Sequence, residues 1–246
     1  MIESQINTLT NSHFTNLGSS SIKQGGAMLM INSNATIHNV EFINNTAVEG
    51  GAVYYSCLGA YDCELDISYS TMKSNHATTS GGAIKYDMFC PVKMENHYEN
   101  NTALYGPDIA SYPVKIKIVD SNTDSIMFTN VGSGIMSDVV FTLGLYDNDD
   151  QIMNLDSSSS IQISLIDRDT SDIDGTLIVK TTNGEALFDE ITFSSLPGTT
   201  NVQYKLDSLG LNKDILRRYY GSNYTQNNIV VDFRFCQPGE IQENSI

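Results

Sequence analysis

The sequence predicts an all-β protein in which a parallel β-helix over residues 1–113 is followed by an immunoglobulin-like β-sandwich over residues 114–235. Three observations predict this fold class. A two-part motif recurs four times in the first half, these repeats lack a helical hydrophobic period, and short β-type segments separated by polar turns fill the second half. The chain of 246 residues, 40% of them hydrophobic, is long enough to build a core in each part.

Each repeat combines a short phrase led by a large apolar residue with a later glycine pair. The second copy reads Phe42-Ile43-Asn44-Asn45-Thr46-Ala47 and then Glu49-Gly50-Gly51-Ala52-Val53-Tyr54. The first glycine lies at positions 25, 50, 81 and 106, so the steps are 25, 31 and 25 residues. A period in that range predicts a solenoid of about four coils. The longer step accommodates an extra loop, Tyr55–Asp62.

Stacking of coils one strand spacing apart gives each repeat position a structural role. The large apolar position should form an inward stack of Phe14, Phe42, Met72 and Tyr98. The asparagine three residues later should occupy a left-handed turn and share amide hydrogen bonds with its copies, at Asn45, Asn75 and Asn101. The glycine pair permits positive φ at the next corner. Leu17 and Pro107 break the pattern in the first and last copies, as expected of end coils.

The Phe-x-x-Asn phrase followed by Gly-Gly-Ala-Ile resembles the repeat of chlamydial polymorphic outer-membrane proteins, which are right-handed β-helices that mediate adhesion. The closing phrase Asn101–Pro113 is also similar to very large surface proteins of ciliates, in which such repeats precede β-sandwich segments and cysteine-rich modules. The resemblance covers residues 13–113 by repeated motif and the rest loosely. It implies a right-handed parallel β-helix followed by an immunoglobulin-like β-sandwich.

After Pro113 the glycine pairs stop and the pattern becomes that of an irregular β domain. We expect strands at 114–118, 139–143, 161–166, 176–179, 186–193 and 229–235. The stretch 209–220 is either one short helix or a long loop. Residues 236–246, which open with Cys236-Gln237-Pro238-Gly239, resemble the start of a cysteine-rich module or form a disordered tail.

Cysteines and glycosylation sequons favour an oxidising, extracellular compartment. Cys57 and Cys63 flank the extra loop and could staple it as a disulfide, whereas Cys90 is expected to be a small buried residue. Because the start of the chain lacks a signal-peptide pattern, an extracellular protein of this kind should be an internal piece of a longer chain. The sequons lie at Asn34, Asn44, Asn100 and Asn223, and we expect the side chains of Asn44 and Asn100 to point outward.

The charge balance excludes several classes of partner. With 13 basic and 29 acidic residues, the formal net charge of −16 disfavours nucleic acid, and we expect attachment to a membrane only through parts outside this chain. Expected partners are other surface proteins, copies of the chain itself, or glycans. At its C-terminal end the solenoid should be capped by the sandwich.

Enzymatic chemistry finds little support in the residues. Pectin-cleaving β-helix enzymes need clustered carboxylates and basic residues, but residues 1–112 contain only four lysines and no arginine. We therefore expect no enzyme and no cofactor. One weak Ca²⁺ site is conceivable if two acidic turns meet, through Asp147, Asp149, Asp167 and Asp169.

Three functions stay open at this point. The first is a non-catalytic structural or adhesive segment of a large extracellular or cell-surface glycoprotein. The second is a carbohydrate-binding module, and the third is a degenerate polysaccharide lyase. The second would use exposed aromatic side chains on the β-helix for stacking, at Tyr54, Tyr55, Tyr61, Tyr69 and Tyr86.

Overall fold

The computed structural model describes residues 6–57, 63–87, 90–121, 125–136, 140–221 and 228–240. The chain divides into two compact units. The first contains residues 1–112 together with the segment Asp147–Gln151, and the second contains the remainder. Asp147–Gln151 thus groups with the repeats, although its position in the sequence assigns it to the sandwich.

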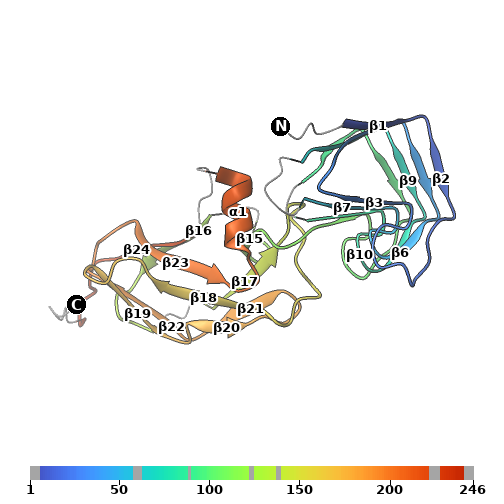
Figure 1. The fold of residues 1–246 in the computed structure, drawn as a ribbon. Helices are drawn as coiled ribbons and strands as arrows, with labels where there is room; N and C mark the ends of the chain where they lie inside the picture. Colours follow the sequence, from blue (N-terminus) through green and yellow to red (C-terminus); the bar gives the residue numbers. More distant parts are fainter. Residues whose placement is uncertain are drawn as a thin grey trace. The chain divides into compact units, whose positions relative to one another are not determined.

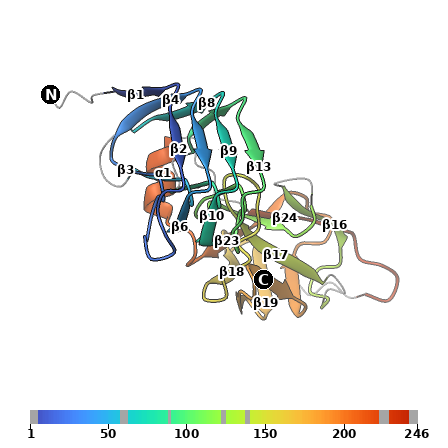
Figure 2. The ribbon, with the colours of Figure 1, turned by 90° about the vertical axis from the view of Figure 1, so that its right-hand side faces the viewer.

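In the described residues, the first unit is a parallel β-solenoid of about three turns (Figures 1 and 2). Its strands form three four-stranded parallel sheets and one two-stranded sheet. Sheet one contains β1 (Ile6–Thr10), β4 (Asn34–His38), β8 (Leu65–Ser68) and β12 (Val92–Met94). Sheet two contains β2 (His13–Thr15), β5 (Glu41–Ile43), β9 (Thr71–Lys73) and β13 (His97–Glu99). Sheet three contains β3 (Met28–Ile31), β7 (Val53–Ser56), β11 (Ile84–Tyr86) and β14 (Ile109–Ala110), and β6 (Thr46–Glu49) pairs with β10 (His76–Ser80).

Each set of strands at one level of the solenoid is called a rung, and the four rungs are numbered from β1–β3 as the first to β12–β14 as the fourth. The strand register repeats from rung to rung, so that Figure 2 shows β2, β9 and β13 aligned in one sheet. Three left-handed residues turn the chain at the corners of a rung. In the second rung they are Asn39, Asn44 and Gly50, with φ of 52°, 55° and 63°.

The left-handed position differs by one residue from the sequence prediction. The residues with positive φ are Asn16, Asn44, Ser74 and Asn100, each of which precedes the predicted ladder position. Because the preceding residue makes the turn, the following asparagine directs its side chain into the solenoid wall. Asn45 and Asn75 are accordingly fully buried.

The second glycine of each pair is required by the close approach of neighbouring rungs. A Cβ atom on Gly51 would lie 2.1 Å from the carbonyl oxygen of Gly82. In turn, a Cβ atom on Gly82 would lie 2.0 Å from the carbonyl oxygen of Pro107. Pro107 itself belongs to the last rung of the described solenoid, where no fifth described rung restricts its side chain.

The second unit is built from antiparallel and mixed sheets. One sheet contains β15 (Lys115–Ile118), β17 (Phe141–Tyr146) and β21 (Glu185–Phe188). A five-stranded sheet contains β16 (Ile126–Val131), β24 (Asn228–Phe233), β23 (Val202–Ser208), β18 (Ser160–Leu165) and β20 (Ile178–Lys180). β19 (Ser171–Gly175) pairs with β22 (Ile191–Ser195), and side chains from all three sheets share one hydrophobic core.

The strand pattern of the second unit differs from the prediction in several places. The expected strand 186–193 is two strands, β21 and β22, separated at Asp189-Glu190. The prediction omits β16, β19 and β23, and β19 begins two residues after Asp169 of the predicted acidic turn. The undecided stretch 209–220 contains the helix α1 (Lys213–Tyr220).

Candidate functional site

The interior of the solenoid is organised by the repeat. Strand register pairs Phe14 with Phe42, Phe42 with Met72, and Met72 with Tyr98. The rings of Phe14 and Phe42 stack with centroids 5.2 Å apart. Phe42 and Met72 are fully buried, whereas Phe14 and Tyr98 at the two ends are half-buried. The stack therefore forms a continuous apolar column across the four rungs.

A ladder of asparagines runs beside this column. The Nδ2 of Asn45 donates to the Oδ1 of Asn75 at 3.0 Å, and the Nδ2 of Asn75 donates to the Oδ1 of Asn101 at 3.0 Å. Each Nδ2 also donates to the carbonyl oxygen of the aromatic or methionine residue one rung earlier. Since each Oδ1 also accepts a backbone N–H from the previous rung, the ladder satisfies buried polar groups at one corner.

The two ends of the ladder are not equivalent. In the first rung Leu17 replaces asparagine and donates its backbone N–H to the Oδ1 of Asn45. In the last rung the Nδ2 of Asn101 donates to the Oδ1 of Asp108 at 2.9 Å. Asp108 thereby occupies the acceptor role that the asparagine of a following rung would have.

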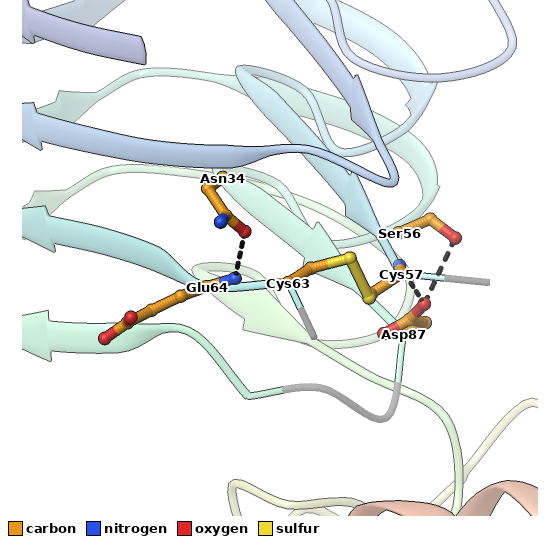
Figure 3. The surroundings of a disulfide bond; sticks show 6 residues. All are labelled: Asn34, Ser56, Cys57, Cys63, Glu64 and Asp87. Atoms are coloured by element: carbon orange, nitrogen blue, oxygen red, sulfur yellow. Dashed lines mark hydrogen bonds between the residues drawn. A yellow bond between two sulfur atoms is a disulfide. The ribbon is translucent and has the colours of Figure 1, made fainter. Parts of the chain in front are cut away.

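A disulfide joins Cys57 and Cys63 at the base of the loop that lengthens the second step, the one of 31 residues (Figure 3). Their Cα atoms lie 5.9 Å apart. At one side of the bridge the buried carboxylate of Asp87 accepts the backbone N–H of Cys57 at 2.5 Å and the hydroxyl of Ser56 at 3.1 Å. At the other side the Oδ1 of Asn34 accepts the N–H of Glu64 at 2.8 Å. The loop is therefore shorter than the predicted Tyr55–Asp62, because Tyr55 and Ser56 belong to β7.

The predicted glycosylation sequons occupy different environments. Asn44 and Asn100 are exposed in left-handed turns on one corner of the solenoid. Asn34 is half-buried and supports the disulfide loop, while Asn223 lies outside the described residues. Glycan occupancy stays a prediction at all four positions.

Three of the five tyrosines predicted to stack on carbohydrate are buried. Tyr54, Tyr55 and Tyr86 are at most 5% exposed, so the prediction that they offer stacking faces is wrong. Tyr55 and Tyr86 point into the solenoid core because they alternate with outward residues along β7 and β11. Tyr69 is exposed and packs edge-on against His38, and Tyr61 lies outside the described residues.

Charged side chains on sheet two pair across neighbouring rungs. His13 lies 2.8 Å from Glu41, and Lys73 lies 2.8 Å from Glu99. The Glu99 carboxylate has a lowered pKa, mainly through its hydrogen bond to Lys73. These exposed pairs leave a polar outer surface and contribute little to stability individually.

Lys85 is the most unusual charged residue of the solenoid. It occupies an outward position of β11, yet it is only 3% exposed. Its Nζ donates to the carbonyl oxygen of Ser111 at 2.8 Å and lies 4.5 Å from the ring centroid of Tyr112. Burial lowers the pKa of Lys85 to about 8, against the opposing effect of Glu49 and Asp147. Nothing in the sequence around Lys85 indicates that this lysine is buried.

The acidic residues named for calcium lie in different settings. Asp147 and Asp149 belong to the first unit, where their carboxylates accept hydrogen bonds from Tyr105 and Tyr86. Asp167 belongs to the second unit and accepts bonds from Asp169 and Thr170. No group of three or more His, Cys, Asp or Glu side chains placed to hold a metal occurs within the described ranges. A calcium site stays a prediction.

No helix within the described residues has the length and apolar character needed to cross a membrane. A family model described as the Chlamydia polymorphic membrane protein repeat matches residues 39–56. This stretch runs from the Asn39 corner to the end of β7 and contains Phe42, Asn45 and the Gly50-Gly51 pair.

Residues 39–56 are thus similar to a polymorphic membrane protein repeat, in agreement with the resemblance drawn from the sequence motif. No curated protein and no solved structure matches the chain. The match covers β5 to β7 of the second rung and fits the β-solenoid architecture.

Proposed function

We propose that this chain is a non-catalytic structural and adhesive segment of an extracellular or cell-surface glycoprotein. In it, a right-handed parallel β-helix would display its polar flanks and an immunoglobulin-like sandwich would follow. The observation that carries the proposal is the polymorphic membrane protein repeat in a rung whose inward stack and asparagine ladder extend through the solenoid. Such a repeat favours a segment of a surface or outer-membrane protein.

Three further features support this proposal. Cys57 and Cys63 form a disulfide, which persists in oxidising compartments. Asn44 and Asn100 present their sequons on an exposed corner. Most predicted stacking tyrosines are buried, which removes the feature that favoured a carbohydrate-binding module. Partners would then be other surface proteins, further copies of this chain, or glycans bound to the polar flanks.

Surface labelling of intact cells that produce the protein tests the location. A membrane-impermeant amine reagent should modify the exposed Lys23, while the buried Lys85 stays unmodified as an internal control for the folded state. Native peptides should also carry glycan at Asn44 or Asn100 and a bridge between Cys57 and Cys63. Labelling of Lys23 only after permeabilisation, with unmodified sequons and free thiols, would contradict the proposal.

A further inference from the structure

The segment Asp147–Gln151 packs on the last rung of the solenoid, although it connects two strands of the other unit in sequence. The segment is a closed turn. The Oδ1 of Asp147 accepts the backbone N–H groups of Asp149 at 2.9 Å and Gln151 at 3.0 Å. Asp147 is fully buried, so its carboxylate is positioned by the protein on all sides.

The turn forms hydrogen bonds with backbone groups on the free edge of β14, at Ile109, and with Ser111 just after the strand. The carbonyl oxygen of Asp108 accepts from Ile84 in the third rung, so the backbone groups of Ile109 and Ser111 face the opposite side. There the Nε2 of Gln151 donates to the carbonyl oxygen of Ile109 at 2.8 Å. The Oδ2 of Asp147 accepts the N–H of Ser111 at 3.2 Å. Side chains thus supply the two bonds that a following strand would supply from its backbone.

The same turn also binds the last inward side chain of sheet one, Lys93 in β12. In sheet one the inward positions of successive rungs are Ile37, Ile67 and Lys93, and the two isoleucines are buried. The ammonium group of Lys93 pairs with the carboxylate of Asp149, which also accepts the hydroxyl of Tyr86 at 2.6 Å. A charged and hydrogen-bonded cluster therefore replaces the next isoleucine.

We propose that Asp147–Gln151 is a cap that terminates the solenoid at its fourth rung and keeps the edge of that rung from pairing with another chain. Edge strands with unpaired backbone groups are templates for association, and solenoids need capped ends. The cap acts together with Asp108, which ends the asparagine ladder at the same rung.

The decisive experiment replaces residues 147–151 by a five-residue glycine–serine linker in the full chain. Amide hydrogen exchange in β12 and β14 should rise roughly tenfold or more, since charged hydrogen bonds are lost. Exchange in β5, β18 and β23 should stay unchanged, and concentration-dependent oligomers should appear in light scattering. The matched control makes the same replacement at Ile166–Thr170, a five-residue connection in the second unit. This control should neither raise exchange in β12 and β14 nor form oligomers.

Two conservative variants decide the outcome if the linker variant fails to fold. Gln151→Leu removes the donor to Ile109, and Asp147→Asn removes the charged acceptor for Ser111 and Tyr105. Each should raise exchange in β14 at least about threefold with the first three rungs unaffected. Unchanged exchange in β14, an equal rise in every rung, or a linker variant that folds and stays monomeric would overturn the proposal.

Discussion

Asn75 shows how one side chain connects three rungs of the solenoid. It donates to the carbonyl oxygen of Phe42 and to Asn101, and it accepts from the backbone and side chain of Asn45. All of these atoms lie at a buried corner. Removal of the amide would leave several polar groups unsatisfied at once, which is the most costly kind of lost hydrogen bond.

Asn75→Ala should therefore lower the free energy of unfolding by about 2–4 kcal/mol, because at least one buried donor and one buried acceptor lose their partner. Urea unfolding compared with that of the exposed-position variant Asn7→Ala measures the difference. A loss no larger than that of the control would show that water satisfies the corner.

Lys85 gives the solenoid a dependence on alkaline pH. Its pKa is lowered from 10.5 to about 8 in the folded state, chiefly by burial, so between these values only the unfolded chain holds the proton. Because the unfolded chain binds one more proton than the folded chain in this range, the titration of Lys85 makes the free energy of unfolding rise with pH above about 8.

The difference in free energy of unfolding between the wild type and Lys85→Met should increase by about 1.4 kcal/mol per pH unit from pH 8 to 9.5. Denaturant titrations of both proteins in that range test this expectation. Tyrosine ionisation affects both proteins alike and cancels in the difference. A difference that stays constant with pH would contradict the lowered pKa.

Among the structural elements, the disulfide loop shows where a rung can gain residues, and the glycine pairs show where neighbouring rungs tolerate no added atoms. The loop between β7 and β8 lengthens one rung without disturbing register, because Ala35 still pairs with Leu65. Its base is held by the disulfide, by Asp87 and by Asn34. The glycine pairs allow no such freedom, because backbones of neighbouring rungs meet there.

Loss of the disulfide should lower the free energy of unfolding only modestly, since the loop that it closes is short. We expect Cys57→Ser with Cys63→Ser to reduce stability by about 2 kcal/mol. Reductant should lower the thermal unfolding temperature of the wild type to that of the double variant, and it should leave the unfolding temperature of the double variant unchanged. Cys236→Ser, which changes an exposed free thiol, is the control and should leave the transition unchanged.

Gly51→Ala should be far more damaging than its size implies. The added Cβ would lie 2.1 Å from one carbonyl oxygen of the adjacent rung and 2.6 Å from another, so the rungs must separate. We expect a loss of roughly 3 kcal/mol or more, in the range of severe overpacking. Gly132→Ala, whose Cβ would meet flexible side-chain ends, should cost much less in the same urea titration. Equal losses of stability in the two variants would show that the close approach of neighbouring rungs does not require glycine at position 51.

At the scale of the whole molecule, the boundary between the units does not follow the sequence. The first unit includes a segment that lies more than thirty residues beyond Tyr112. A fragment ending at Pro113 therefore contains all four rungs but lacks Asp147–Gln151.

This fragment should unfold at a lower temperature than the solenoid in the full chain, and β12 and β14 should exchange first, because their edge bonds and the partner of Lys93 are removed. Calorimetry and hydrogen exchange measure both effects. A fragment as stable as the solenoid in the full chain would mean that residues 1–113 are sufficient.

The repeat and its structural consequences follow from the amino-acid sequence alone. The alignment of Phe14, Phe42, Met72 and Tyr98 predicts which side chains lie above one another, and the strand register pairs the same residues. This succeeds because a solenoid converts a sequence period directly into a spatial contact. The spacing of the glycines likewise predicts where rungs turn, since positive φ is costly for other residues.

Features that depend on distant segments became visible in the folded chain alone. The burial of Lys85 and Tyr54 cannot be read from their neighbours in sequence, because an outward position on a strand is covered or exposed according to what packs on it. The same reason explains Asp147, which reads as part of an acidic turn but lies buried against the last rung. Repetition fixes contacts between equivalent positions, whereas a segment that occurs once has no second copy to reveal its place.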